Sequence, residues 1–252
     1  MSVLILDFEA TGVDANTVRT LEIGAQVTPN DFSEPLISMS QLVWGSGYPA
    51  LTNEVQEVTG ITQRLLDDAA VPPEDAFKLL SDIIPDDLEF CVAFNRSYDE
   101  ALFKAEAKRL ALGIMRGGNI LLQVPWLCAM VDVEENYKFK SWKLKHLALD
   151  HGVTVNPKEL HRAINDVELT RKMLHSVPTC AEKMYEFQKE PWVYLQAQVS
   201  FANKDLAKAQ GFTWERAKGD DSDRVFTKTW VKRVKSSHVE REMDHGFKVI
   251  TI

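Results

Sequence analysis

The segment Val3-Leu4-Ile5-Leu6-Asp7-Phe8-Glu9-Ala10-Thr11-Gly12 runs from branched apolar residues into two carboxylates and a glycine. The apolar run predicts a buried first strand over residues 3–8. Because side chains alternate along a strand, Asp7 and Glu9 share one face and can point at a single site. Two carboxylates at the end of a buried strand repel each other and lose hydration unless a cation lies between them. This pair alone therefore indicates either a divalent metal site or a solvated strand end.

Composition and charge restrict the class of protein. The chain has 252 residues, of which 45% are hydrophobic and 26% charged, enough for one substantial core and a smaller appended unit. A formal net charge of −8 argues against a protein that binds nucleic acid through lysine and arginine alone. It does not argue against an enzyme whose carboxylates hold divalent metals, because the metals then carry the positive charge.

The N-terminus and the cysteines favour a cytoplasmic protein without membrane contact. The N-terminus is apolar but lacks the basic start of a signal peptide, and Asp7 interrupts it. No apolar run approaches the roughly 20 residues that a membrane helix requires. Cys91, Cys128 and Cys180 are odd in number and form no close C-x-x-C pair. We therefore expect buried, reduced thiols.

The hydrophobic pattern predicts an α/β fold, a mixed five-stranded sheet flanked by helices on both faces. Apolar runs bounded by turn residues predict strands at 3–8, 21–28, 36–44, 89–94 and 120–126. Helical periodicity and proline positions predict helices within 52–84 and at 99–112, 142–150, 161–175 and 179–189. Gly117-Gly118 precedes the apolar run that predicts the fifth strand.

A small α+β domain is predicted at residues 190–252, after a first domain at 1–189. From residue 190 onward, eleven Lys and Arg stand against nine Asp and Glu. Short strands with helices at 203–210 and 236–245 are expected, and the polar loop 218–223 is expected to be mobile.

The aromatic residues of this smaller domain have two interpretations. Interleaved with basic residues, they form either a stacking and phosphate-binding surface for single strands or the core of a domain with little else to bury. The core interpretation fits most of them. The basic strand 228–235 is the segment expected to contact nucleic acid, and a protein-docking role is the further alternative.

Two more acidic motifs follow the first at element boundaries. Asn95 and Asp99 come after the apolar strand 89–94, where Asn95 can brace the turn and Asp99 lies near a helix start. Taken alone, Asp99 reads as an ordinary N-cap aspartate. His161 and Asp166 are five residues apart, so they share no face of a regular helix. They converge only if His161 lies on the loop before the helix, and a surface histidine beside a solvated aspartate is the alternative.

Together the three motifs resemble those of the DEDDh branch of the proofreading-type 3′–5′ exonuclease family. The match runs in order through Asp7 to Gly12, Asn95 to Asp99 and His161 to Asp166, and covers about residues 3–176. The sister branch has a tyrosine four residues before the last aspartate, where this chain has Arg162. The resemblance implies a ribonuclease-H-like fold and a nuclease activity.

The resemblance also implies a two-metal mechanism. Two divalent ions about 4 Å apart neutralise a phosphodiester and stabilise the attacking and leaving oxygens. Oxygen ligands suit two Mg²⁺ or Mn²⁺ ions. Asp7, Glu9 and Asp166 are implied to hold the first ion, and Asp7 with Asp99 the second. His161 is implied to be the general base that takes a proton from the attacking water.

The implied substrate is a nucleic acid with a free 3′ end, from which nucleoside monophosphates are released. The residues expected near its terminal nucleotide are Phe8, Ala10, Thr11, Gly12, Phe94 and Asn95. Phe94 and Tyr98 stand where the family often has His and Phe, which bears on substrate preference.

The three carboxylate motifs do not decide which nucleic acid is degraded, because they read phosphate and not sugar. Single-stranded DNA is the expected substrate, and an RNA-trimming or oligonucleotide-degrading exoribonuclease is the alternative. An inactive nuclease fold acting as a scaffold is the alternative from a different class.

Overall fold

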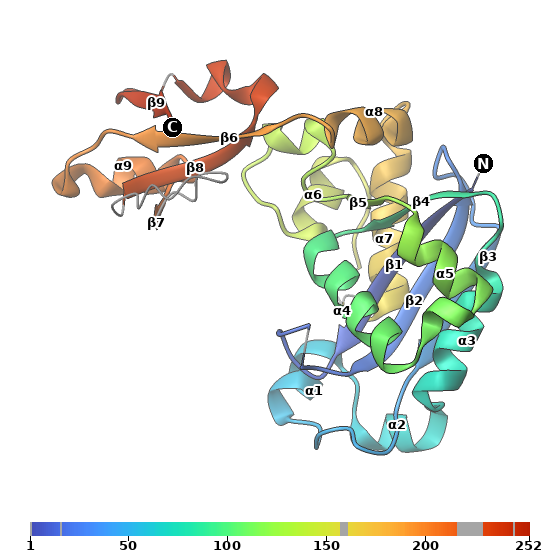
Figure 1. The fold of residues 1–252 in the computed structure, drawn as a ribbon. Helices are drawn as coiled ribbons and strands as arrows, with labels where there is room; N and C mark the ends of the chain where they lie inside the picture. Colours follow the sequence, from blue (N-terminus) through green and yellow to red (C-terminus); the bar gives the residue numbers. More distant parts are fainter. Residues whose placement is uncertain (1, 16, 157–160, 216–228, 244) are drawn as a thin grey trace. The chain divides into compact units, whose positions relative to one another are not determined.

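A computed structural model describes the chain except residues 1, 16, 157–160, 216–228 and 244, so the predicted mobile loop 218–223 lies outside the described residues. The described residues form two compact units, Met1–Gln188 and Lys189–Ile252 (Figure 1). All three cysteines are buried and unpaired, in agreement with the expected reduced thiols. No helix among the described residues is long and apolar enough to cross a membrane.

The larger unit is built on the predicted mixed five-stranded sheet, whose strand order is β3-β2-β1-β4-β5. The strands are β1 (Ser2–Ala10), β2 (Thr20–Pro29), β3 (Ile37–Leu42), β4 (Leu88–Ala93) and β5 (Trp126–Cys128). β1 pairs antiparallel with β2 and parallel with β4, so the first strand lies at the centre of the sheet. β2 pairs antiparallel with β3, and β4 pairs parallel with β5.

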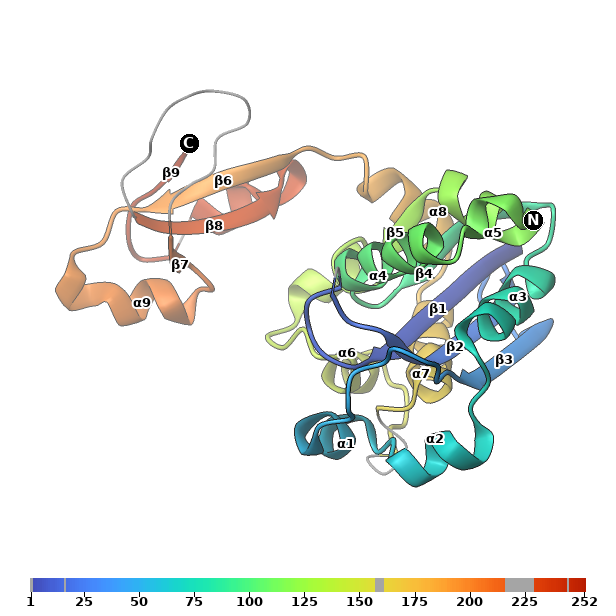
Figure 2. The ribbon, with the colours of Figure 1, turned by 60° about the horizontal axis from the view of Figure 1, so that its bottom comes forward.

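Helices cover both faces of this sheet (Figures 1 and 2). The helices of the larger unit are α1 (Asn53–Thr59), α2 (Gln63–Ala69), α3 (Pro73–Ile83), α4 (Arg96–Arg109), α5 (Arg116–Gln123), α6 (Leu144–Asp150), α7 (Ala163–His175) and α8 (Cys180–Phe187), with 3₁₀ helices at Leu112–Ile114 and Glu134–Lys138. Leu4 and Leu6 of β1 pack in one core with α3, α4 and α5, whereas Val3 and Ile5 pack in a second core with α6, α7 and α8. Odd-numbered residues of β1 therefore face α7.

The predicted fifth strand at 120–126 is wrong, because α5 occupies most of this run and β5 begins only at Trp126. The glycine pair lies inside α5 and makes no turn. A Cβ on Gly117 would lie 2.1 Å from the carbonyl oxygen of Ser81, so only glycine lets α5 approach α3 this closely. The apolar residues of the run are divided between the buried side of α5 and the start of β5.

Two other helix predictions change at their boundaries. The run 52–84 forms three helices: the first ends at Gly60, whose φ is +69°, and the Thr62 side chain caps the second by accepting from the Leu65 N–H. The helix predicted at 99–112 begins earlier, at Arg96, and ends at Arg109.

The smaller unit contains a four-stranded antiparallel sheet in the order β7-β8-β6-β9. Its elements are β6 (Trp192–Ala197), α9 (Lys204–Ala209), β7 (Thr213–Glu215), β8 (Thr229–Lys235) and β9 (Val249–Thr251), with 3₁₀ turns at Phe201–Asn203, Ser236–His238 and Glu240–Met243. Leu195, Phe212 and Trp230 lie in its core, whereas Trp214 is 49% exposed.

The helix predicted at 236–245 is absent from the described residues, which form two 3₁₀ turns there instead. Glu242 turns back toward the sheet and pairs with Lys232 at 2.5 Å and with His245 at 2.9 Å. These contacts hold the segment in short turns, because they fix Glu242 against the sheet.

Candidate active site

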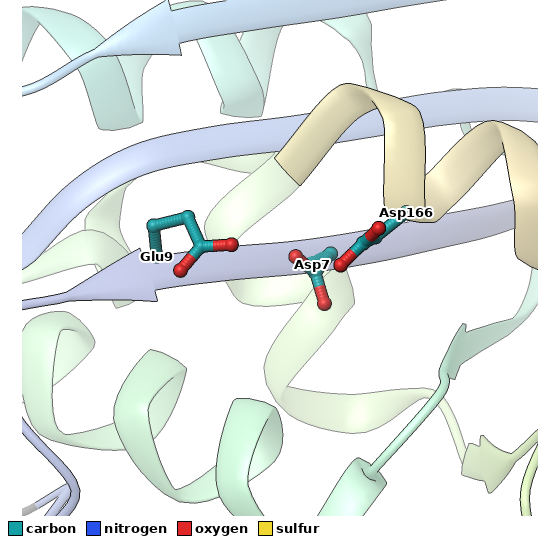
Figure 3. Close-up of side chains that lie close together, drawn as sticks. All are labelled: Asp7, Glu9 and Asp166. Carbon is teal, nitrogen blue, oxygen red and sulfur yellow. The ribbon is translucent and has the colours of Figure 1, made fainter. Parts of the chain in front are cut away.

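The end of β1 carries two carboxylates on the face that α7 covers. Asp7 and Glu9 are odd-numbered, so they point away from the α3–α5 core and toward α7. Asp166, in the first turn of α7, reaches the same place (Figure 3). One carboxylate oxygen of each of these three residues lies within 4.8 Å of the others. The structure thus brings together three of the predicted site residues.

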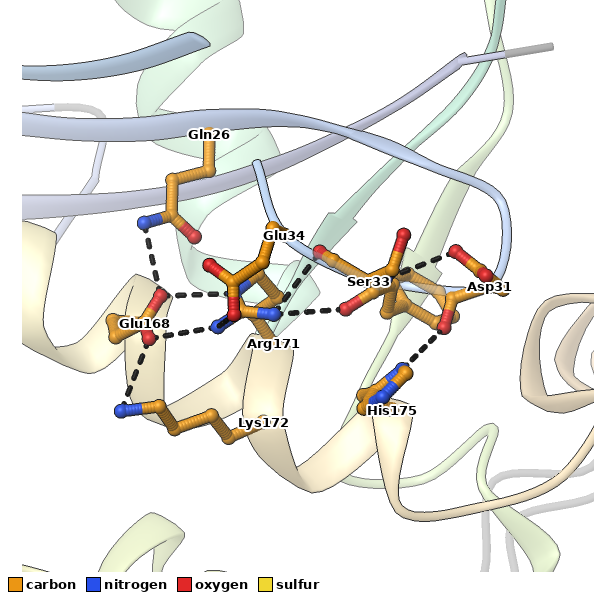
Figure 4. A network of polar contacts seen from close by, with 9 residues as sticks. Gln26, Asp31, Ser33, Glu34, Glu168, Arg171, Lys172 and His175 are labelled. Carbon is orange, nitrogen blue, oxygen red and sulfur yellow. Dashed lines mark hydrogen bonds and ion pairs between the residues drawn. The ribbon is translucent and has the colours of Figure 1, made fainter. Parts of the chain in front are cut away.

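Helix α7 is fixed to the sheet by close packing and by an ion-pair network. A Cβ on Gly24 of β2 would lie 2.3 Å from the Ala163 carbonyl carbon, so glycine allows the helix to begin directly on the strand. Farther along, Glu168 accepts from Gln26 Nε2 at 3.0 Å and from Arg171 Nε at 2.9 Å (Figure 4). The Arg171 guanidinium also donates to the carbonyls of the turn before β3. Asp166 is therefore held on a rigid element.

Asp99 lies beside the three carboxylates but outside their group. It comes from the first turn of α4, is 3% exposed and accepts a hydrogen bond from the Phe8 N–H at 3.2 Å. Burial raises the pKa of Asp99 to about 7, against the lowering effect of the Phe8 hydrogen bond. Asn95 makes no side-chain cap bond to α4, and instead accepts from the Ser97 hydroxyl at 2.9 Å, which braces the turn.

The carboxylates are electrostatically unfavourable as they stand. Burial raises the pKa of Asp7 well above its ordinary value, and Asp99 and Glu9 raise it further. Burial and then Asp166 raise the pKa of Glu9 to about 8. Burial also raises the pKa of Asp166, whose Oδ1 is buried without a hydrogen-bond partner among the described residues. A divalent cation would remove the repulsion and complete the contacts of that oxygen, so these residues fit a metal ion.

His161 lies outside α7, as its spacing from Asp166 requires. Its φ is +64°, a left-handed conformation that is uncommon for a residue other than glycine. The side chain is exposed and lines the same cavity as Asp7, Asp99 and Asp166. Its charge lowers the pKa of Asp166. His161 is therefore placed to exchange a proton with a molecule in that cavity.

The cavity has a volume of about 510 Å³. Of the residues expected near the terminal nucleotide, Phe8, Phe94 and Asn95 contribute to its lining, whereas Ala10, Thr11 and Gly12 do not. Ala10 is buried in the core. The Thr11 hydroxyl accepts from the Arg19 N–H at 3.0 Å.

Glu22 is a buried site neighbour that the sequence patterns did not identify. It lies opposite Glu9 in the β1–β2 pairing and has an exposed fraction of 0%. It accepts from Arg162 Nε at 2.9 Å, from Arg162 Nη2 at 2.7 Å and from the Ala163 N–H at 3.1 Å. The available signal was a charged residue inside an apolar strand, between Leu21 and Ile23. Glu22 thus fixes the residue that follows His161.

The model of the RNase_T exonuclease family matches residues 4–174. The chain belongs to this exonuclease family. The family match and the shared fold identify the protein as a DEDD-type 3′–5′ exonuclease with a ribonuclease-H-like fold. The family resemblance and the fold class expected from the sequence are confirmed.

Solved structures of other nucleases share the fold of this exonuclease. E. coli Exonuclease I in complex with a dA16 oligonucleotide has a TM-score of 0.66 and 14% identity, covering 98% of this chain and 68% of that chain. Exonuclease X in complex with 5′ overhanging duplex DNA has a TM-score of 0.52 and 20% identity, covering 73% and 98%. A 3′-exonuclease that recognises a histone mRNA stem-loop has a TM-score of 0.54 and 14% identity, covering 69% and 80%. No curated protein sequence matches the chain.

Exonucleases of this family use divalent metal ions, and the triad of Asp7, Glu9 and Asp166 is a carboxylate group of this chain that fits one. Asp7 and Asp166 line one cavity with the buried Asp99 and the exposed His161, and Glu9 lies beside the first two. The site therefore offers oxygen ligands and a proton acceptor together. This arrangement can neutralise a phosphodiester and remove a proton from a nucleophile.

Proposed function

We propose that this exonuclease belongs to the histidine branch and uses two Mg²⁺ or Mn²⁺ ions to release nucleoside monophosphates from the 3′ end of single-stranded DNA. The observation that carries this proposal is the convergence of Asp7, Glu9 and Asp166 within 4.8 Å, beside a cavity that Asp99 and His161 also line. An inactive scaffold is disfavoured, because every predicted ligand and the histidine are present.

Each residue of the site then has a distinct role. Asp7, Glu9 and Asp166 would hold one ion, and Asp7 with Asp99 the other. When bound, the ions supply charge neutralisation of the scissile phosphate. His161 accepts a proton from the attacking water on an imidazole nitrogen, a general-base role that histidine commonly takes. The Phe8 N–H donates to Asp99 and holds its carboxylate in place to bind the second ion.

The terminal nucleotide is proposed to lie against Phe8, Phe94 and Asn95, which line the cavity. The backbone of Thr11 and Gly12, outside this lining, is proposed to approach its edge, and Ala10 lies in the core and is not proposed as a contact. Phe94 is partly exposed and lines the cavity, so its ring is available to a base. Tyr98 donates from its hydroxyl to the Gly12 carbonyl at 2.6 Å, which holds the segment after β1 in place.

DNA is favoured over RNA by the extent of structural similarity. The neighbour whose structure holds a dA16 oligonucleotide matches 98% of this chain, including the smaller unit. The neighbour bound to an mRNA stem-loop matches 69%. RNA trimming or oligonucleotide degradation is the second candidate function.

The smaller unit is proposed to be an accessory domain that contacts single-stranded nucleic acid or a protein. On its sheet, the Arg233 guanidinium lies 4.4 Å from the Trp192 ring centroid, a basic and aromatic combination that suits nucleic acid. The buried, unpaired thiols support a cytoplasmic location.

The primary test is a substrate panel with Mg²⁺, using single- and double-stranded DNA and RNA with free or blocked 3′ ends. We expect release of nucleoside monophosphates from unblocked single-stranded DNA and none after a 3′ block or with a metal chelator. Degradation of 3′-blocked strands would overturn the polarity, and faster turnover of matched RNA would favour the second candidate.

Asp7→Ala tests the site itself. Hydrolysis should fall about a thousandfold or more, because several kcal/mol of charge stabilisation depend on the ions that Asp7 holds. The exposed acid Glu54→Ala is the matched control and should keep full activity. Circular dichroism should show the same fold for both variants, and full activity of Asp7→Ala would contradict the assignment.

A further inference from the structure

One wall of the active-site cavity differs from the carboxylate wall in its chemistry. Trp142, Lys143 and Lys145 line the cavity together with Asp7, Asp99 and Asp166. Trp142 and Lys143 directly precede α6 and Lys145 lies in its first turn, whereas the three acidic motifs come from β1, α4 and the start of α7. The cavity therefore combines an acidic region, suited to cations, with an aromatic and basic region, suited to bases and phosphates.

Trp142 is held in a fixed position. The Tyr137 ring meets it edge-on, with ring centroids 4.9 Å apart and planes at 81°. Tyr137 in turn packs on Phe187 at 5.7 Å, and its hydroxyl donates to the Val131 carbonyl at 3.2 Å. Such edge-to-face contacts are favourable, so Tyr137 restrains the orientation of the Trp142 ring from one side. The rest of the Trp142 ring is partly exposed at the cavity and can accept a flat ligand.

Lys143 and Lys145 are exposed and make no ion pair with any acid in the part of the chain that the structure describes. Other lysines of the larger unit do pair: Lys104 lies 2.6 Å from Glu100, Lys172 lies 3.1 Å from Glu168, and Lys183 lies 3.0 Å from Glu135. In a unit with an excess of acids, two lysines that face a cavity without acidic partners leave their charge available to a bound anion.

The number of cationic groups indicates which part of a strand they bind. A terminal nucleotide with a free 3′ hydroxyl carries one phosphate, the scissile one, and the proposed metal ions take it. Any further phosphate that Lys143 and Lys145 bind must therefore belong to nucleotides on the 5′ side of the scissile bond.

We propose that Trp142, Lys143 and Lys145 form a binding subsite for the nucleotides on the 5′ side of the scissile bond. Trp142 stacks on the base of the penultimate nucleotide, and the two lysines bind backbone phosphates of the same single strand. This subsite rests on the proposed exonuclease function, since it assigns the upstream part of that substrate.

The experiment compares two substrates of the full-length protein with Mg²⁺. One is an oligothymidylate with a free 3′ end, together with a matched oligouridylate. The other is the p-nitrophenyl ester of thymidine 5′-monophosphate, which has a terminal nucleotide and a cleavable phosphodiester but no upstream nucleotide. The variants are Trp142→Ala, Trp142→Phe and the double variant Lys143→Ala with Lys145→Ala. Lys140→Ala is the matched control, because Lys140 is exposed nearby and lines a separate hollow.

We expect Trp142→Ala to lower kcat/KM for the oligothymidylate about 10-fold, from the lost stacking of one base, and Trp142→Phe to restore most of it. The double lysine variant should reduce the slope of log KM against log salt concentration by about 1.4, as expected for two lost single-strand phosphate contacts. All variants should hydrolyse the p-nitrophenyl ester at the wild-type rate, and Lys140→Ala should match wild type on both substrates.

Unchanged kcat/KM for the oligothymidylate in all variants would overturn the subsite. Equal losses on the oligonucleotide and on the p-nitrophenyl ester would also overturn it, because the residues would then serve the terminal nucleotide or the fold. If wild type hydrolyses neither DNA, RNA nor the ester, the proposed function itself has failed, and the two failures are thereby distinguished. The same losses on oligouridylate as on oligothymidylate would show that the subsite reads the base and phosphate and not the sugar.

Discussion

Tyr98 connects two motifs of the site through a single hydroxyl group. It lies in the first turn of α4, directly before Asp99, and donates to the Gly12 carbonyl at 2.6 Å. Burial, and next to it the charge of Asp99, raise the pKa of Tyr98 to about 12. The hydroxyl therefore stays protonated at neutral pH and remains a donor. The Thr11–Gly12 segment after β1 is thus attached to α4, the helix that carries Asp99.

Tyr98→Phe should raise KM for oligonucleotides several-fold and leave kcat nearly unchanged. The reason is that the lost hydrogen bond to Gly12 contributes about 0.5–1.5 kcal/mol, whereas Tyr98 is not one of the proposed metal ligands. Steady-state kinetics on single-stranded DNA would measure this, with Tyr185→Phe on the exposed side of α8 as control. An unchanged KM would show that the hydroxyl does not position the segment after β1.

At the residue scale, local patterns predicted the acidic residues and the histidine but not their partners. Asp7 and Glu9 share a strand face, and the spacing of His161 and Asp166 places His161 outside the helix, so both features follow from sequence neighbours. The pairing of Glu22 with Arg162 joins residues 140 positions apart. No local period encodes a contact of that separation, and it emerges only when β2 and α7 pack together.

The start of α7 is an element whose position depends on that long-range pair. Glu22 is fully buried and accepts both Arg162 donors and the Ala163 N–H, while the neighbouring His161 has a φ of +64°. A residue other than glycine keeps this conformation only when the surroundings enforce it. The Arg162 fork and the packing of Ala163 on Gly24 supply that constraint.

Arg162→Ala should lower kcat about 10-fold or more, with a smaller change in KM, because His161 loses its fixed position relative to the cavity. It should also destabilise the fold by about 1–3 kcal/mol, since the buried Glu22 loses its partner. Arg162→Lys keeps the charge but not the two-pronged contact and should recover part of kcat. Single-turnover kinetics and denaturant unfolding measure the two effects, and a kcat equal to that of wild type in Arg162→Ala would rule out the positioning role.

The elements themselves were predictable where the hydrophobic period was clear. β1, β2, β3 and β4 lie where branched apolar runs predicted them. The error at 120–126 arose because a glycine pair marks both turns and close helix contacts, and only the position of Ser81 decides between them. The His161 conformation was likewise beyond sequence patterns, since it results from tertiary constraint.

At the scale of the whole molecule, the site carboxylates make the stability of the fold depend on pH. Burial raises the pKa of Glu9 to about 8 and that of Asp99 to about 7, so the folded protein keeps protons that the unfolded chain has already lost. The free energy of unfolding falls as pH rises wherever the folded state binds more protons. Stability of the metal-free protein is therefore lost as the pH rises through the folded-state pKa values of these acids.

The informative window lies between pH 6.5 and 8. Glu168 has a pKa lowered to about 2, chiefly by the Arg171 contact that opposes its burial, so its stabilising effect is complete well below this window. Burial lowers the pKa of His151, so its contribution, which rises with pH, is largely complete by its ordinary value of 6.5. Above that pH, the raised carboxylates of the active site dominate the slope.

Metal-free protein should therefore unfold at a lower temperature at pH 8 than at pH 6.5. Its free energy of unfolding should fall by up to about 1.4 kcal/mol per pH unit for each proton released. Mg²⁺ should raise the unfolding temperature more at pH 8 than at pH 6.5, because it binds the ionised carboxylates and stabilises the folded state by mass action. Glu9→Gln, which cannot ionise, should reduce the pH slope of the metal-free protein and weaken the effect of Mg²⁺. Calorimetry at both pH values, with chelator and with Mg²⁺, measures each quantity. A metal-free protein that becomes more stable between pH 6.5 and 8 would show that these carboxylates do not carry raised pKa values, and the electrostatic basis for the metal site would fall with them.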